Sequence, residues 1–240
     1  FGEMVGEEAN NQNTNKGVKI TGWYGPGMNI HRSPFGGRNF EYYSEDGLLA
    51  GKIAAGAVKG AASKGLITYL KHLALNNQET NRTTAGGVCT WTNEQAMREI
   101  YLRPFELAVK EGGATGMMCA FNRIGGVPAG ANYNLFVNLL EKEWGFKGLS
   151  VTDYYENSSW GWPGNMVVRC HMFPMGNYSK EGKKRQIDGT WDNELKRPVV
   201  NEEAQDALYY AVRTTATRMM YAVANSNAVT IQDVFPDTTL

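Results

Sequence analysis

Short apolar runs alternate with helix-forming stretches along this sequence, and this alternation limits the possible folds more than any other feature. The apolar runs lie at residues 19–30, 66–75, 115–121, 148–152 and 166–173. Apolar residues recur at helical spacing in residues 48–63, 92–111, 131–144 and 202–224. Repeated strand and helix units form parallel strands joined by right-handed crossovers. The sequence therefore predicts either a doubly wound sheet or a barrel.

Polar residues lie at the ends of the predicted strands, where both architectures place their chemistry. Lys71 and His72 interrupt the second run, and Asp153 directly follows the fourth. No Gly-x-Gly-x-x-Gly or Walker-type loop follows the first run, which disfavours a nucleotide-binding sheet. We predict an α/β fold of the TIM-type (β/α) barrel class, incomplete, in a single domain over residues 1–240.

The composition excludes several classes of partner. Lys plus Arg and Asp plus Glu number 24 each, and the net charge of zero argues against nucleic acid or an anionic membrane as the partner. No apolar stretch approaches the roughly 20 residues of a membrane-spanning helix. The three cysteines and three histidines have no metal-ligand spacing. We expect a soluble protein without metal or other cofactor; the odd cysteine count only slightly favours the cytoplasm, so the location stays undetermined.

Asp153 is the first candidate for chemistry. An acidic residue directly after a buried strand is typical of a functional position in a barrel, although it could instead cap a helix. Lys71 and His72 sit in an apolar run, where a buried cation needs a ligand oxygen or a structural carboxylate as partner. Both explanations of this pair stay open at this point.

Arg38 is the second kind of candidate, because it lies in a glycine-rich loop. Its planar guanidinium could bind vicinal hydroxyls or a carboxylate of a ligand. It could equally hold Glu41 or Asp46 in place.

Four motifs in order resemble family 3 glycoside hydrolases, the β-glucosidase family, over about residues 20–160. The first is a long loop, residues 25–32 (GPGMNIHR) and 36–46 (GGRNFEYYSED). The others are residues 71–79 (KHLALNNQE), 120–126 (AFNRIGG) and 144–154 (WGFKGLSVTDY).

The resemblance implies a role for each matching residue. Asp153 would be the nucleophile that forms a covalent glycosyl-enzyme, and no cofactor is needed. Hydroxyls of the sugar in the first subsite would be held by Arg38, Lys71, His72 and Arg82. Phe121 and Tyr154 would also face the sugar, at positions where many relatives have Tyr and Trp.

The resemblance also implies that parts of the site lie elsewhere. The sequence begins partway through what resembles the helix before the second barrel strand, so the first strand and its sugar-binding Asp are expected to be absent. Residues 168–176 depart from the family pattern. Relatives take their acid/base Glu from a second domain, which leaves that group unidentified here. Conceivable substitutes are Glu79, Glu156 and His171.

The leading hypothesis is a retaining β-glucosidase-type barrel acting on β-glucosides or similar saccharides and needing a partner segment for the acid/base. Open strand edges would be covered by a second copy or a complementing chain. The alternative is a carbohydrate-binding remnant without turnover. A third possibility is that the sequence is an excerpt of a longer enzyme.

Overall fold

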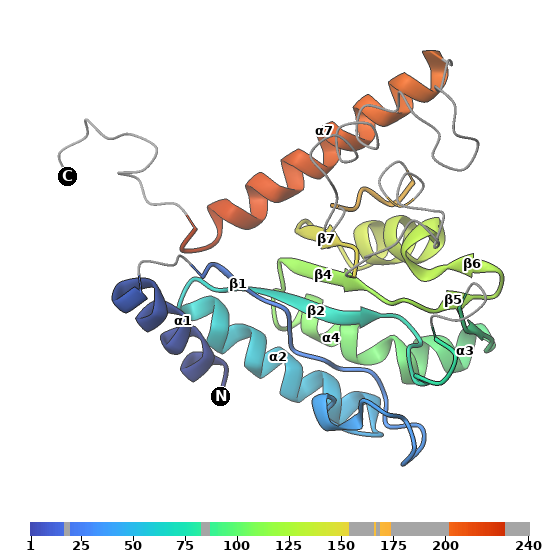
Figure 1. Cartoon of the computed structure of the whole chain (residues 1–240), viewed down its shortest axis with the longest axis horizontal. Coiled ribbons are helices and arrows are strands. Elements are labelled where there is room, and N and C mark those ends of the chain that lie inside the picture. The colour runs from blue at the N-terminus through green and yellow to red at the C-terminus, as the bar shows by residue number, and fades with distance from the viewer. Residues whose placement is uncertain (17–19, 83–86, 154–165, 167–168, 174–201, 229–240) are drawn as a thin grey trace.

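A four-stranded parallel sheet organises the computed structural model, which describes residues 1–16, 20–82, 87–153, 166, 169–173 and 202–228 (Figure 1). Its strands are β1 (Gly22–Trp23), β2 (Ile67–Leu73), β4 (Gly116–Cys119) and β7 (Leu149–Val151). They lie side by side in sequence order, and each pair is parallel. This is the order expected for one part of a barrel wall.

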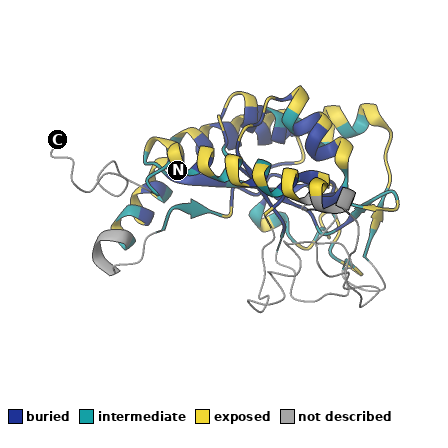
Figure 2. Ribbon diagram, turned by 90° about the horizontal axis from the view of Figure 1, so that it is seen from above, coloured by how far each residue is buried: buried dark blue, intermediate teal, exposed yellow. Residues whose placement is uncertain are grey.

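The connecting helices pack against one face of the sheet. They are α1 (Gly2–Lys16), α2 (Gly47–Ser63) and α4 (Arg103–Lys110). The main apolar core joins Val58 of α2 and Phe105 of α4 to Leu70 of β2. Exposed residues mark the outer sides of these helices (Figure 2). The helix predicted at residues 48–63 is confirmed, and the Asp46 side chain caps it by accepting a 2.8 Å hydrogen bond from Leu49 N.

The helix predicted at residues 92–111 is interrupted. It consists of α3 (Glu94–Ala96), a π-helical turn η2 (Met97–Tyr101) and α4. Pro104 has no N–H for the carbonyl four residues earlier, and a continuous α-helix therefore cannot form here. Instead Leu102 N donates to Met97 O, five residues back, at 2.8 Å.

The helix predicted at residues 131–144 is also modified. A short 3-10 turn, η3 (Ala129–Ala131), precedes η4 (Asn134–Glu143), whose hydrogen bonds are of the π type. A small second sheet joins β3 (Cys89–Thr90), β5 (Arg123–Ile124) and β6 (Val127–Pro128). The sequence did not predict this sheet, because its two-residue strands are too short to show a periodic pattern.

A long helix, α7 (Glu202–Ala224), lies on the opposite face of the sheet (Figure 1). Met219 and Ala222 of α7 pack against Ile67, Leu149 and Val151 in a small separate apolar cluster. The side chains of β2 therefore alternate between two cores, as the pleat of a strand requires. The helix occupies the residues predicted as helical at 202–224.

An ion-pair network joins α7 to η4. Glu141 of η4, whose side chain is 8% exposed, accepts from Arg218 of α7 at 2.8 Å, and His171 Nδ1 lies 3.2 Å from the same carboxylate. Arg218 also donates to Phe146 O at 3.0 Å. These contacts fix the C-terminal half of α7 against the sheet.

Two predicted strands differ in the structure. The run at residues 19–30 forms only the two-residue β1 and a bridge from Gly27 to Lys71, because Pro26 cannot donate to a strand ladder. The strand-like reading of residues 166–173 is wrong in its described part. Met166, Arg169 and Cys170 are helical there, and Phe173 pairs with Val151.

Among the described residues, no helix combines the length and the apolar character needed to cross a membrane.

Candidate active site

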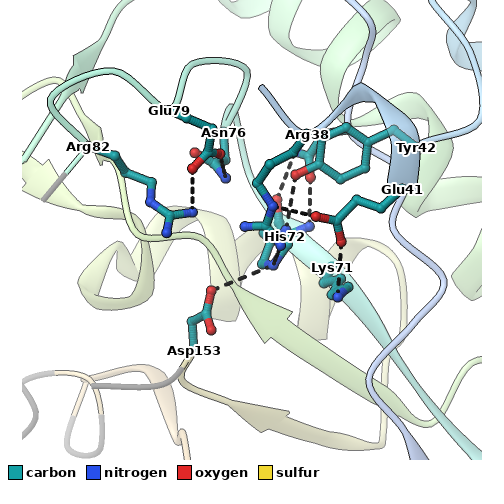
Figure 3. Close-up of polar contacts among 10 residues, drawn as sticks. Arg38, Glu41, Tyr42, Lys71, His72, Asn76, Glu79, Arg82 and Asp153 are labelled. Carbon is teal, nitrogen blue, oxygen red and sulfur yellow. Dashed lines mark hydrogen bonds and ion pairs between the residues drawn. The ribbon is translucent and has the colours of Figure 1, made fainter. Parts of the chain in front are cut away.

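Side chains from three segments meet at the carboxyl edge of the sheet (Figure 3). Lys71 and His72 lie in the last three residues of β2, and Asp153 lies two residues beyond β7. Arg38 comes from the loop that enters the short 3-10 helix η1 (Asn39–Glu41). Because parallel strands all end at this edge, residues far apart in sequence share one small volume.

His72 is at the centre of this group and is only 2% exposed. Its Nε2 lies 3.2 Å from Arg38 Nη2 and 3.6 Å from Asp153 Oδ2, and its Nδ1 lies 3.3 Å from Tyr42 Oη. Asn29 fixes the backbone: its Oδ1 accepts from His72 N at 2.7 Å, and its Nδ2 donates to His72 O at 2.9 Å. The ring is therefore held on every side.

The electrostatic surroundings keep the imidazole neutral. Burial, followed by the positive charges of Arg38, Lys71 and Arg82, holds the pKa of His72 well below its usual value of 6.5. A neutral ring has one N–H and one acceptor nitrogen. Since a guanidinium cannot accept, Nε2 is the acceptor and the Nδ1–H donates to Tyr42 Oη.

Glu41 is the counter-ion of two cations in the group. Its carboxylate accepts from Arg38 Nε and, through its other oxygen, from Lys71 Nζ at 3.1 Å. Burial raises the pKa of the Glu41 carboxyl, but the hydrogen bonds from Arg38 and Lys71 outweigh it and leave that pKa below 4.5. Glu41 is therefore ionised at neutral pH.

Arg82 is the third cation of the site, after Arg38 and Lys71. Its Nη1 lies 2.8 Å from Glu79 Oε2, and its guanidinium stacks on the Phe121 ring with Cζ 4.6 Å from the centroid. Asn76 donates to the other oxygen of Glu79 at 3.3 Å. The buried Oδ1 of Asn76 has no hydrogen-bond partner among the described residues, and could accept one from a ligand.

The structure brings together most residues expected to form the site. Direct or shared contacts join Arg38, Lys71, His72 and Asp153. Arg82, stacked on Phe121, lies near enough for its charge to act on His72. Tyr154 and Glu156 lie outside the described residues. His171 pairs with Glu141 and packs edge-on against Tyr210 of α7, 6.2 Å between ring centroids.

The sequence analysis did not predict the full role of three residues of this group. Asn29 and Tyr42 were not singled out, and Glu41 was considered only as a partner of Arg38. The signal for Glu41 and Tyr42 is their spacing, because one turn of η1 places residues three and four positions after Arg38 on the same side. Asn29 gives no such signal, since its partner is the main chain of a distant strand.

The arrangement suits a neutral ligand rich in hydroxyl groups. Guanidinium and ammonium groups donate to hydroxyl oxygens, and carboxylate oxygens and buried amide oxygens accept from them. No group of three metal-ligating side chains occurs in the part of the chain that the structure describes.

Known proteins resemble this chain over most of its length. A β-glucosidase of Ruminococcus albus is 43% identical over 139 residues, which are 58% of this chain and 14% of that protein. An exo-α-(1→6)-L-arabinopyranosidase of Bifidobacterium longum is 42% identical over 173 residues, 72% of this chain and 22% of that protein. The chain thus matches only a minor part of the length of these relatives.

Solved structures share the fold. β-Glucosidase 3B from Thermotoga neapolitana, in complex with α-D-glucose, superposes on 94% of this chain with a TM-score of 0.71 and 33% identity, using 30% of its own length. A β-glucosidase from Paenibacillus barengoltzii superposes on 95% with a TM-score of 0.73 and 31% identity, using 24% of its length. The predicted TIM-type barrel class is confirmed, and the described strands are an arc of such a barrel.

The sequence also matches the glycosyl hydrolase family 3 N terminal domain over residues 3–171, which is more than half of its length. The chain therefore belongs to glycosyl hydrolase family 3.

Proposed function

We propose that this chain supplies the nucleophile and the sugar-binding groups of a retaining glycosidase that acts on β-linked glucosides. The observation that carries the proposal is the position of Asp153, at the end of β7 and 3.6 Å from a neutral, buried His72. The surrounding cations, Arg38 and Lys71, can bind the hydroxyls of a sugar placed over the carboxylate. Glycosidase relatives with more than 40% identity support the same reaction class.

Asp153 would attack the anomeric carbon as the bond from that carbon to the aglycone oxygen breaks. The product of this step is a glycosyl-enzyme ester of inverted configuration, and the aglycone oxygen takes a proton as it leaves. Water then attacks the same carbon from the opposite side as the ester bond to Asp153 breaks, gives one proton to the acid/base, and restores the configuration. Hydrogen bonds to ring hydroxyls that strengthen in the oxocarbenium-like transition state accelerate both steps.

The proton donor is not among the side chains assigned to the site. Glu79 is paired with Arg82, and His171 is paired with Glu141. We propose that the acid/base is supplied from outside the described residues, as the departures of the sequence from its family also indicate.

An aryl β-glucoside with a strongly activated leaving group tests the nucleophile without the acid, because such a group leaves with little protonation. We expect the chain to release the phenol, and Asp153→Ala to release at least about a hundredfold less. Glu106→Gln, a change on the outer surface of α4, is the control. Release unchanged in Asp153→Ala would reject Asp153 as the nucleophile.

Azide adds a stereochemical test. Azide that intercepts the glycosyl-enzyme of the wild-type chain gives the β-glucosyl azide, since two inversions occur. Azide that replaces the missing carboxylate in Asp153→Ala gives the α-glucosyl azide through a single inversion. Aryl α-L-arabinopyranoside should be assayed in parallel, because the relative from Bifidobacterium longum is named for that sugar.

A carbohydrate-binding protein without turnover is the second candidate. The ion pairs that engage both Glu79 and His171 favour it, because they leave no assigned proton donor in the described residues. Saturable binding of glucose with no release from either aryl substrate would select this alternative.

We also propose that a second copy of the chain, or a complementing chain, covers an open edge of the sheet. In the described part of the chain β7 has β4 on one side and only the single bridge from Val151 to Phe173 on the other. Exposed strand edges readily pair with further strands.

A further inference from the structure

The carboxylate of Glu41 lies between two cations that come from different parts of the chain. One oxygen accepts from Arg38 in the loop before η1, and the other lies 3.1 Å from Lys71 Nζ on β2. The side chains of all three are about one-fifth exposed, which limits screening by water. Glu41 is thus the link between the loop and the strand.

The short helix η1 presents its residues to His72 as one unit. Glu41 N donates to Arg38 O at 3.1 Å, and His31 Nε2 lies 3.0 Å from Tyr42 O and anchors the end of the turn. From this turn, Arg38 reaches His72 Nε2 and Tyr42 reaches His72 Nδ1. A shift of the turn would therefore change both contacts of the ring.

The position of Arg38 depends on a competition among nearby carboxylates. His72 Nε2 is within 3.6 Å of both Arg38 Nη2 and Asp153 Oδ2. The two groups thus approach the same ring nitrogen, and attraction between opposite charges is substantial in a partly buried site. Without the Glu41 carboxylate, Arg38 would remain near two other carboxylates, Glu79, whose charge also acts on the guanidinium, and Asp153, which approaches the same nitrogen of His72.

We infer that Glu41 is a positioning residue that holds Arg38 and Lys71 together and keeps Arg38 on His72 Nε2. Its effect on a ligand passes entirely through those two side chains. The inference rests on the proposed function, since Arg38 and Lys71 need fixed positions only if they bind a sugar.

The tautomer of His72 reports the position of Arg38 directly and needs no ligand. With Arg38 in place, Nε2 accepts and Nδ1 bears the proton. In Glu41→Gln, we expect Arg38 to leave His72 Nε2 for another carboxylate, so that the proton shifts toward Nε2. Nitrogen-15 NMR of the side chain separates the protonated from the unprotonated ring nitrogen, and the chain has only three histidines to assign.

Glucose binding, measured by calorimetry, is the second readout. We expect the affinity of Glu41→Gln for glucose to fall by about tenfold or more, because hydrogen bonds from two charged groups are displaced. Glu41→Asp keeps the charge but is one methylene shorter, and should show a smaller change in both readouts. Glu106→Gln is the matched control, since Glu106 also pairs with one arginine and one lysine, Arg103 at 2.9 Å and Lys110 at 2.8 Å.

The two readouts separate this inference from the proposed function. If the wild-type chain does not bind glucose while Glu41→Gln still switches the His72 tautomer, the positioning role stands and the proposed sugar site fails. If the tautomer of His72 is unchanged in Glu41→Gln, the inference is overturned. Should Glu41→Gln not fold, Glu41→Asp decides the question by the same NMR signals, and no change there also overturns it.

Discussion

His72 is buried as a neutral ring among three cations, and this lowers the stability of the folded state at acidic pH. The folded state holds the pKa of His72 below 6.5, whereas the unfolded chain has the usual value. Below pH 6.5 the unfolded state therefore binds a proton that the folded state does not. Stability is fully present above pH 6.5 and is lost as the pH falls from there toward the folded pKa.

We predict that the free energy of unfolding falls by roughly 1 kcal/mol more in the wild-type chain than in His72→Gln between pH 7.5 and 5.5. Urea unfolding at the two pH values measures the difference. His31 and His171 are present in both proteins, so their contributions cancel. Equal losses in the two proteins would show that His72 can take up its proton without unfolding.

At the residue scale, the sequence predicted the polar residues that interrupt or directly follow an apolar run. Asp153 and His72 break or end apolar runs, so the edge of the sheet could be identified as their common location. The contacts of Asn29 could not be predicted, because a side chain that binds a distant backbone leaves no periodic pattern. Whether Arg38 would bind a ligand or Glu41 also required the structure, which shows Arg38 in contact with Glu41 and His72.

At the element scale, α2 provides two glycines in opposite environments. A Cβ on Gly51 would lie 2.6 Å from Leu107 Cδ1 and 3.1 Å from Pro104 Cα, at the closest approach of α2 to α4. A Cβ on Gly56 would have no heavy atom within 4 Å, and that residue is exposed. The same substitution should therefore have opposite effects at the two positions.

We predict that Gly51→Ala destabilises the protein by about 1–3 kcal/mol through overpacking. Gly56→Ala should instead stabilise it by about 0.5–1 kcal/mol, because alanine is a better helix former than glycine. Chemical denaturation of both variants gives the comparison, and each serves as the control of the other. Equal effects would mean that α2 and α4 separate easily.

The elements that could be predicted are those with a full periodic pattern. Residues 48–63 form one helix because alanines and valine recur on one face with no proline in between. The segment at 92–111 could be identified as helical, but the turn at Met97–Tyr101 depends on how the chain accommodates Pro104 in three dimensions. The strand-like run at 166–173 failed because apolar periodicity over so few residues does not separate a strand from a helix.

At the scale of the whole molecule, the sheet has an open side at β7. If a second copy or a complementing chain pairs there, the sedimentation coefficient should rise with protein concentration in the micromolar range. A lysine at an edge position discourages strand pairing. Phe173→Lys places a lysine at this edge and is the variant that tests the association, because Phe173 is 37% exposed. Ser150→Lys would not test it, because Ser150 is buried. A monomer at every concentration would exclude the association.

The position of α7 bears on what such a partner could do. Since α2 and α4 follow their strands on the outer face of the arc, the face beneath α7 is the one that would point into a closed barrel. A helix about 10 Å across occupies that space. In a closed barrel this face is covered by side chains from the other strands, so a partner that closed the barrel would have to displace Met219 and Ala222 from it. Closure of the barrel by a partner would therefore begin with the displacement of α7.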